Sequence, residues 1–156
     1  MIVLRPARPG ELTLLWELRT RAIAHACVAH YRADVLAAWL GSPPPASMPE
    51  LIDQGTAILA EEDGRPLGYA ALDSSSGEVH AVFVEPDRHG QGIGVLLMQA
   101  VLDAARASGC VRLFLSASLN AVPFYERAGF TAVREEAYPH RSGIGIASVF
   151  MEKRLD

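Results

Sequence analysis

The amino-acid sequence predicts an α+β fold, and three observations support that class. Apolar residues recur near helical spacing close to the N-terminus, in "ELTLLWELRTRAIAHACVAHY". Short apolar runs separated by turn residues follow in the middle of the chain. A strand, a long amphipathic helix and another strand then come in succession, which indicates one crossover connection.

The N-terminal third is predicted to form one short strand and two helices. Residues 1–5 are expected to be the strand, and residues 11–31 carry apolar side chains near helical spacing. Residues 33–40, "ADVLAAWL", continue as a second, shorter helix. Because three consecutive prolines cannot continue a helix, residues 41–49, "GSPPPASMP", are expected to form a surface loop.

The centre of the chain is predicted to be a three-stranded antiparallel meander. Its three runs, residues 55–62, 65–73 and 77–85, are rich in aliphatic and aromatic residues. They are separated by "DG" and by "SSSG", both of which are typical of hairpin turns.

The C-terminal half is predicted to begin with an amphipathic helix over about residues 92–108. A buried strand at 111–117 and a short helix at 121–129 follow. Residues 130–138 and 145–155 are expected to form a final hairpin. The complete order therefore holds seven strands and four helices.

Length and composition predict one soluble domain, residues 1–156, located in the cytoplasm. No apolar run approaches the roughly 20 residues that span a membrane, and the N-terminus lacks the apolar core of a signal peptide. Cys27 and Cys110 lie in no metal-ligand spacing, so both are expected to be reduced thiols. The net charge of −4 argues against nucleic acid, so a small-molecule partner is expected. Without a long apolar run, no membrane contact is expected.

The segment "EPDRHGQGIG" (85–94) follows a predicted strand and precedes the long helix. Such a loop forms an anion site, because free backbone N–H groups and the positive end of the helix dipole converge there. A tight turn that needs positive φ is the alternative explanation of its glycines. Two other phosphate motifs do not fit: a dinucleotide fingerprint would need glycine where Leu97 stands, and the G-K-[ST] of a Walker loop is absent.

Two motifs resemble the GNAT superfamily of acyl-CoA-dependent N-acyltransferases. "HGQGIG" (89–94) is similar to its pyrophosphate loop R/Q-x-x-G-x-G/A, with His89 in place of Arg or Gln. "SLNAVPFYERAGF" (118–130) resembles the family's Asn followed by F-Y-x-x-x-G-F, and the N-terminal helices resemble an uncharacterised bacterial subgroup of the small-molecule type. The resemblance implies the GNAT fold: a mixed, mostly antiparallel sheet of about seven strands, splayed between strands 4 and 5 and flanked by about four helices.

The same resemblance implies acetyl-CoA as co-substrate, without a metal ion. Pantetheine would lie in the gap between the splayed strands, and the loop amides would hold the pyrophosphate. The residues that the resemblance assigns to acetyl-CoA are Val82, Phe83, Val84, Arg88, His89, Gly90, Gln91, Gly92, Ile93, Gly94, Asn120 and Phe124. Asn120 has a second expected role, as a cap of the following helix.

Acetyl transfer to an amine needs a neutral nucleophile, because an ammonium group has no lone pair. A general base is worth roughly 10²–10⁴ in rate. Glu78 and His80 are spaced two residues apart on a strand, so both are expected on one face, together with Val82 and Val84. His80, Glu78 or water is the candidate base. By the resemblance, Tyr125 is the candidate acid that protonates the departing thiolate.

The sequence is therefore interpreted as an N-acetyltransferase that acts by direct attack in a ternary complex. Its acceptor is expected to be a primary amine on a small molecule or a peptide, and no motif identifies that amine. A CoA-binding sensor or interaction module without turnover is the alternative, and an enzyme for longer acyl-CoA is a third. The oligomeric state, including a homodimer, stays open.

Overall fold

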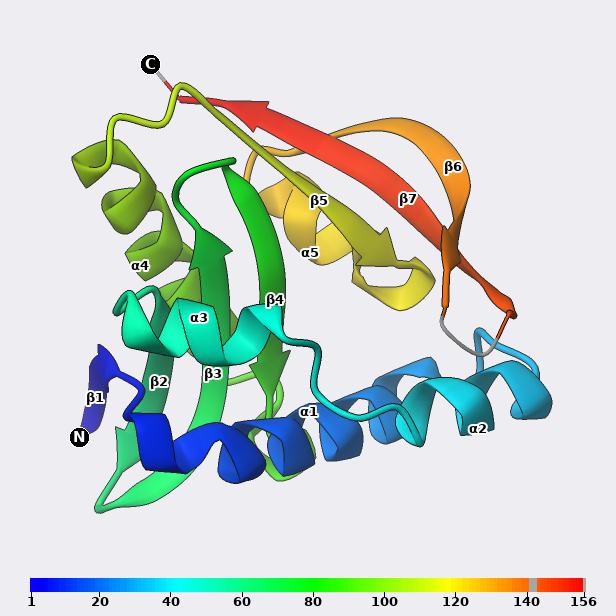
Figure 1. Ribbon diagram of the computed structural model, residues 1–156, viewed down its shortest axis with the longest axis horizontal. Helices are drawn as coiled ribbons and strands as arrows, with labels where there is room; N and C mark the ends of the chain where they lie inside the picture. Colours follow the sequence, from blue (N-terminus) through cyan, green and yellow to red (C-terminus); the bar gives the residue numbers. More distant parts are fainter. Residues whose placement is uncertain (141–142, 156) are drawn as a thin grey trace.

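One seven-stranded sheet runs through the computed structural model, which describes residues 1–140 and 143–155 (Figure 1). The strands are β1 (Ile2–Pro6), β2 (Ala57–Glu62), β3 (Arg65–Asp73), β4 (Glu78–Val84), β5 (Arg112–Ser118), β6 (Thr131–Pro139) and β7 (Gly145–Arg154). Their order across the sheet is β1-β2-β3-β4-β5-β7-β6. The β4–β5 pair is parallel and the other neighbours are antiparallel.

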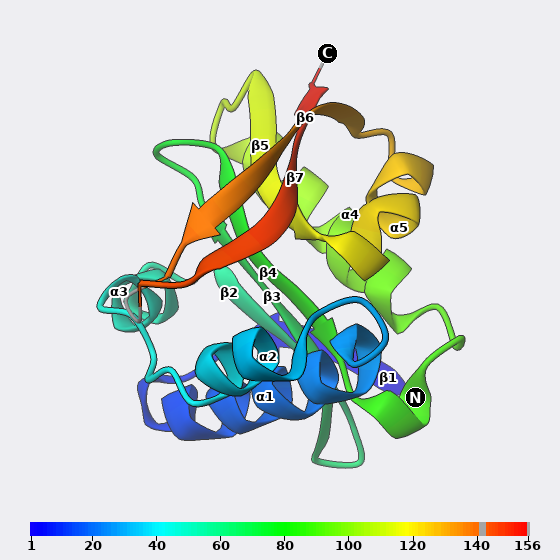
Figure 2. The same cartoon turned by 90° about the vertical axis from the view of Figure 1, so that its right-hand side faces the viewer.

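Helices cover both faces of this sheet (Figure 2). They are α1 (Leu12–Cys27), α2 (Ala33–Leu40), α3 (Ser47–Asp53), α4 (Ile93–Ala107) and α5 (Val122–Arg127), with 3-10 turns η1 (Pro9–Glu11), η2 (Pro86–Arg88) and η3 (Leu119–Ala121). On one face, α4 and α5 pack against β3, β5 and β7. On the other, α1 and α3 pack against β2, β3 and β4. The sheet therefore separates two apolar layers.

The parallel pair is joined at only one point. Glu78 of β4 pairs with Phe114 of β5, and no further pair follows among the described residues. The two strands then separate toward their C-terminal ends, while β5 keeps a full antiparallel pairing with β7 (Figure 1). The predicted α+β class, the seven strands and the splay between strands 4 and 5 are thus confirmed.

The predicted number of helices is wrong by one. The segment expected to be a loop contains the start of α3, which buries Met48, Leu51 and Ile52. These residues follow helical spacing, and Pro49 lies in the first turn, where its missing N–H removes no helical bond. The first helix is also shorter than expected, since α1 ends at Cys27 and a turn follows.

Candidate active site

A cavity of about 1040 Å³ opens where β4 and β5 separate. It extends from the loop before α4, past β4, to α1 and the end of the β6–β7 hairpin. Of the residues that the sequence analysis assigned to acetyl-CoA or to catalysis, all but Gln91 line it. The fold therefore gathers these separate segments around one space.

His80 is the extra residue of a β-bulge in β4. The register between β3 and β4 shifts there, because Ala81 is paired with Ala71 while Val79 is paired with Leu72. A bulge bends its strand and re-aims the side chains on either side of it. This irregularity lies at the mouth of the splay, close to the one residue pair that joins β4 to β5.

The bulge corrects the expectation that Glu78 and His80 share a face with Val82 and Val84. Val79 instead joins Val82 and Val84 in the core beneath α4. Strict alternation fails here, because one extra residue exchanges the faces of all side chains beyond it. Glu78 Oε1 lies 3.6 Å from His80 Nε2, and both side chains are partly exposed and line the cavity.

The glycines of the loop have two different structural reasons. Gly90 and Gly92 have φ values of +77° and +79°, in the left-handed region that strains other residues. Gly92 is the N-cap of α4, where no side chain caps the helix, so the first helical N–H groups have no side-chain acceptor. At Gly94, a Cβ would lie 3.0 Å from Cε1 of Phe124, so this glycine lets α5 pack against α4.

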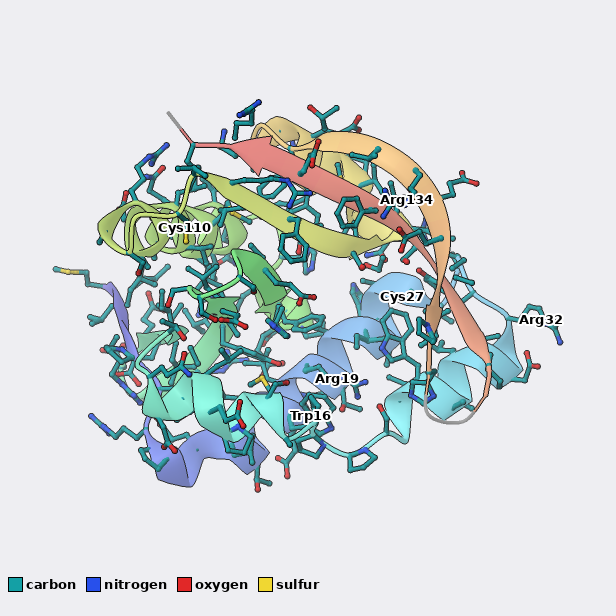
Figure 3. All side chains as sticks on the ribbon, turned by 45° about the horizontal axis from the view of Figure 1, so that its top comes forward. Trp16, Arg19, Cys27, Arg32, Cys110 and Arg134 are labelled. Atoms are coloured by element: carbon teal, nitrogen blue, oxygen red, sulfur yellow. The ribbon has the colours of Figure 1, made fainter. Side chains whose placement is uncertain are left out.

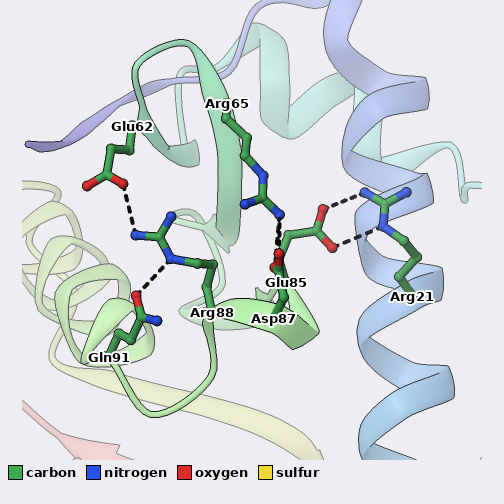
Figure 4. Close-up of polar contacts among 7 residues, drawn as sticks. All are labelled: Arg21, Glu62, Arg65, Glu85, Asp87, Arg88 and Gln91. Carbon is green, nitrogen blue, oxygen red and sulfur yellow. Dashed lines mark hydrogen bonds and ion pairs between the residues drawn. The ribbon is translucent and has the colours of Figure 1, made fainter.

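Arginine–carboxylate pairs hold the β4–α4 loop from two sides (Figure 4). Arg21 of α1 donates two hydrogen bonds, of 3.0 and 2.7 Å, to the buried carboxylate of Glu85. Arg65 of β3 donates to Asp87 at 2.9 and 2.7 Å, and this bond holds the pKa of Asp87 below its usual range. The partners are 64 and 22 residues apart, so the sequence did not indicate these pairs.

The two basic side chains of the loop have different surroundings. Arg88 donates to Gln91 Oε1 at 2.7 Å and to Glu62 Oε1 at 3.0 Å, so its charge is already paired (Figure 4). Gln91 is not among the residues that line the cavity. The ring of His89 lines the cavity, and its centroid lies 6.0 Å from that of His25 on α1.

Tyr125 of α5 lines the cavity with its ring held between two phenylalanines. The ring centroids of Phe124 and Phe130 lie 5.2 and 5.8 Å away in edge-to-face geometry. Within the described part of the chain, the Tyr125 hydroxyl has no hydrogen-bond partner. Burial raises the pKa of Tyr125 well above its ordinary value, so the phenol stays protonated at neutral pH. It therefore holds a proton that it can donate.

Asn120 does not cap α5, contrary to one expectation. The N-cap is Ala121, and no side chain bonds there. Asn120 Oδ1 instead accepts a hydrogen bond of 3.1 Å from Cys27 Sγ at the end of α1. Burial raises the pKa of Cys27 to about 11, so this thiol stays protonated and able to donate. Cys27 and Cys110 are both free thiols, as expected.

Part of the cavity wall is built from α1 and the segment after α2 (Figure 3). Arg19 is only 3% exposed, and its guanidinium carbon lies 4.2 Å from the centroid of the Trp16 ring. It donates to Trp39 O at 2.8 Å, to Ser42 Oγ at 3.1 Å and to Thr20 Oγ1 at 3.1 Å. Burial lowers the pKa of Arg19, although an arginine in a protein stays charged. Arg19 belongs to none of the sequence motifs described above.

Comparison with known families agrees with this geometry. Residues 27–155 match the family model described as an acetyltransferase (GNAT) domain. The chain belongs to the GNAT acetyltransferase family. Within this GNAT chain, "HGQGIG" spans the loop and the first turn of α4, and "VPFYERAGF" spans α5 and the turn before β6.

Relatives of this GNAT chain carry acetyltransferase names. It is 30% identical over 133 residues to the IAA acetyltransferase of Azospirillum brasilense, covering 75% of this chain and 84% of that protein. It is 31% identical over 90 residues to an uncharacterised N-acetyltransferase of Methanocaldococcus jannaschii, covering 50% of this chain and 40% of that protein. The match to the glucosamine 6-phosphate N-acetyltransferase of Trypanosoma brucei brucei covers 53% of the relative. The chain thus spans about half the length of these last two relatives.

Solved structures share the fold. A GCN5-related N-acetyltransferase from Rhodopseudomonas palustris superposes with a TM-score of 0.85 and 25% identity, covering 98% of this chain and 95% of that chain. The PaiA N-acetyltransferase of Thermoplasma acidophilum, solved in complex with coenzyme A, superposes with a TM-score of 0.73 at 16% identity, with 99% of each chain covered.

In residues 1–140 and 143–155 there is no helix of the length and apolarity that crossing a membrane requires, and no cluster of three or more metal-ligating side chains.

Proposed function

We propose that this chain transfers the acetyl group of acetyl-CoA to a primary amine by direct attack in a ternary complex. One observation carries the proposal: β4 pairs with β5 at a single residue, which leaves its edge open in the same cavity as the N-terminus of α4. An open strand edge suits the two amides of pantetheine, and a helix N-terminus suits a pyrophosphate. The coenzyme A held by the Thermoplasma protein of the same fold supports the same ligand.

The reaction needs two proton transfers, and candidate groups for both line the cavity. As the amine nitrogen bonds to the acetyl carbon, its proton passes to His80, with Glu78 or water as the alternative acceptor. His80 is preferred because its side chain stands on the bulge with the Glu78 carboxylate at 3.6 Å. The carbon–sulfur bond then breaks, and the departing thiolate takes a proton from the Tyr125 hydroxyl.

A CoA-binding module, the alternative to an enzyme, would bind acetyl-CoA but would not transfer its acetyl group. Purified protein is incubated with acetyl-CoA and a panel of primary amines, and acetylated products are detected by mass spectrometry. Acetyl-CoA binding is measured on the same sample. Binding with acetylation of at least one amine supports the proposal. Binding without product from any amine or peptide, under conditions where a known acetyltransferase reacts, points to the module instead.

A further inference from the structure

Arg19 is a buried cation with no acidic partner. None of the described residues places a carboxylate within 4 Å of its guanidinium, although the chain forms many other arginine–carboxylate pairs. Its partners are a backbone carbonyl and two hydroxyls, which use three of the five N–H groups of an arginine. A buried charge is costly unless an opposite charge compensates it, so this site lacks the group that would stabilise it most.

Arg19 lines the cavity, although only 3% of the residue is exposed. Arg19 is the one charged residue that the chain before β2 contributes to the cavity wall. Around it the wall is formed by apolar and aromatic side chains, including Trp16, Trp39 and Met48. Tyr69 also lines this part, and burial raises the pKa of its hydroxyl, so it stays a neutral donor. The arrangement offers one full positive charge within apolar walls.

The wall around Arg19 differs in chemistry from the wall at the glycine-rich loop. The loop carries a helix N-terminus, whose free N–H groups suit the multiple charges of a pyrophosphate, and the His89 ring lines the cavity beside it. A single guanidinium over an indole suits one carboxylate, to which its two remaining N–H groups can donate charge-assisted hydrogen bonds. The candidate bases Glu78 and His80 line the same cavity.

We propose that the acceptor amine carries a carboxylate and that Arg19 binds it, an inference that rests on the proposed acetyl transfer. In this arrangement the carboxylate lies against Arg19 and Trp16, and the amine is directed toward the bulge in β4. Arg19 then acts as a specificity-determining residue. Amino acids, with their amine and carboxylate on one small molecule, are the substrate class that fits.

A purely structural role for Arg19 makes a different prediction. Its bonds to Trp39 O and Ser42 Oγ hold the segment after α2 against α1. If that were its whole function, its loss would lower the rate with every acceptor by the same factor. Binding of a carboxylate would instead affect only those acceptors that carry one.

The test compares matched acceptors. Several α- and ω-amino acids are each paired with their own primary amide, which keeps the amine and side chain but removes the charge. The value of kcat/KM is measured for both members with saturating acetyl-CoA. For at least one pair, the wild type should prefer the carboxylate at least about tenfold, in line with the strength of a charge-assisted pair. Because an amino-acid amide has the more readily deprotonated amine, chemistry alone would give the opposite order.

Variants assign the preference to Arg19. Arg19→Gln should bring the ratio to within about threefold of one, and Arg19→Lys, which keeps the charge, should retain part of it. Arg21→Gln is the matched control on the same helix: it removes an arginine that faces Glu85, and it should leave the ratio as in the wild type. Circular dichroism and acetyl-CoA affinity check the folding of each variant; if Arg19→Gln does not fold, the wild-type ratio and Arg19→Lys decide.

Two results would overturn this inference while leaving acetyl transfer intact. One is a wild type that uses amides as well as it uses amino acids. The other is an equal loss for both members of each pair in Arg19→Gln. Failure to acetylate any amine, despite acetyl-CoA binding, contradicts the proposed function itself and this inference with it.

Discussion

At the scale of a single residue, removal of the Tyr125 hydroxyl tests most directly which group protonates the departing thiolate. Because this group has no hydrogen bond to lose within the described chain, Tyr125→Phe should leave the packing of its ring intact. We expect kcat to fall at least about tenfold, while the Kd for acetyl-CoA stays within about twofold, as for a group that acts only in the transition state. Equal turnover by variant and wild type across the pH range would assign protonation of the thiolate to another group.

The base can be assigned from the pH dependence of the rate. If His80 accepts the amine proton, the wild-type kcat/KM should rise with pH as the base loses its own proton. His80→Gln should lower the rate by about 10²-fold or more and remove that rise, whereas Glu78→Gln should keep it. Loss of the rise in Glu78→Gln alone would transfer the role to the glutamate.

The two cysteines should differ in reactivity. With a pKa of about 11, Cys27 has only about one thiolate in a thousand at pH 8, and it is also buried. Iodoacetamide at pH 8 should therefore modify the half-buried Cys110 first, and both thiols in denaturant. Peptide mass spectrometry reads out the order. Equal modification of both cysteines in the folded protein would contradict the protonated donor inferred for the contact with Asn120.

Some residue-level features could be predicted from sequence and others could not. Tyr125 and the loop glycines were recognised because they belong to motifs with fixed spacing. The bulge at His80 was not recognised, because the alternation of side chains along a strand does not reveal where an extra residue is inserted. Arg19 carried a usable signal: it stands four residues from Leu15 and from Ile23, on the buried face of α1. A charged side chain on the buried face of a helix indicates a candidate functional site.

At the scale of elements, the start of α1 is joined to the sheet by a charged network. Arg5 of β1 donates to Glu11 at 2.9 and 2.7 Å and to Glu61 of β2 at 3.0 and 3.2 Å. The hydrogen bonds from Arg5 lower the pKa of Glu11 from 4.5 to about 2. A carboxylate whose pKa is lowered by folding stabilises the protein above its unfolded pKa, and this contribution is lost as the pH falls from about 4.5 toward 2.

Glu11→Gln should therefore lower the free energy of unfolding by about 1 kcal/mol at pH 7, a modest value because the pair is partly exposed. The difference from the wild type should shrink steadily as the pH is lowered from about 4.5 toward 2. Urea titrations at several pH values measure it. Glu126→Gln, at an exposed position, is the control and should show little change at any pH. A Glu11→Gln deficit that persists unchanged to low pH would contradict the lowered pKa.

Among the helices, α2 and α4 were predicted well, and α3 was not. The amphipathic stretch assigned to α4 was located to within a residue at each end, because six of its apolar side chains repeat on one face. The helix α3 was missed because the prolines before it suggested a loop that continues past residue 46. Its signal was limited to three apolar residues, and much of its stability comes from packing against α1 and β3.

At the scale of the whole molecule, the site exists because the sheet separates. The splay between β4 and β5 could be predicted through the resemblance that the two sequence motifs carry. The surroundings of the cleft were not predictable in this way. Ion pairs such as Arg21–Glu85 join segments that lie far apart in the chain, and α1 forms part of the cavity wall. Local sequence patterns do not predict such long-range contacts.

The most direct test of the central claim, that this cleft binds acetyl-CoA, is a calorimetric titration of three proteins. Gly92→Val places a side chain in the open space where the pyrophosphate is expected, and Gly64→Val introduces the same strain in the β2–β3 turn, since both glycines have φ of +79° with nothing within 4 Å. Both variants should lose similar stability. We expect Gly92→Val to bind acetyl-CoA at least about tenfold more weakly, about 1.4 kcal/mol, and Gly64→Val to bind as the wild type does. Equal affinity in all three proteins, or no binding by the wild type, would contradict it.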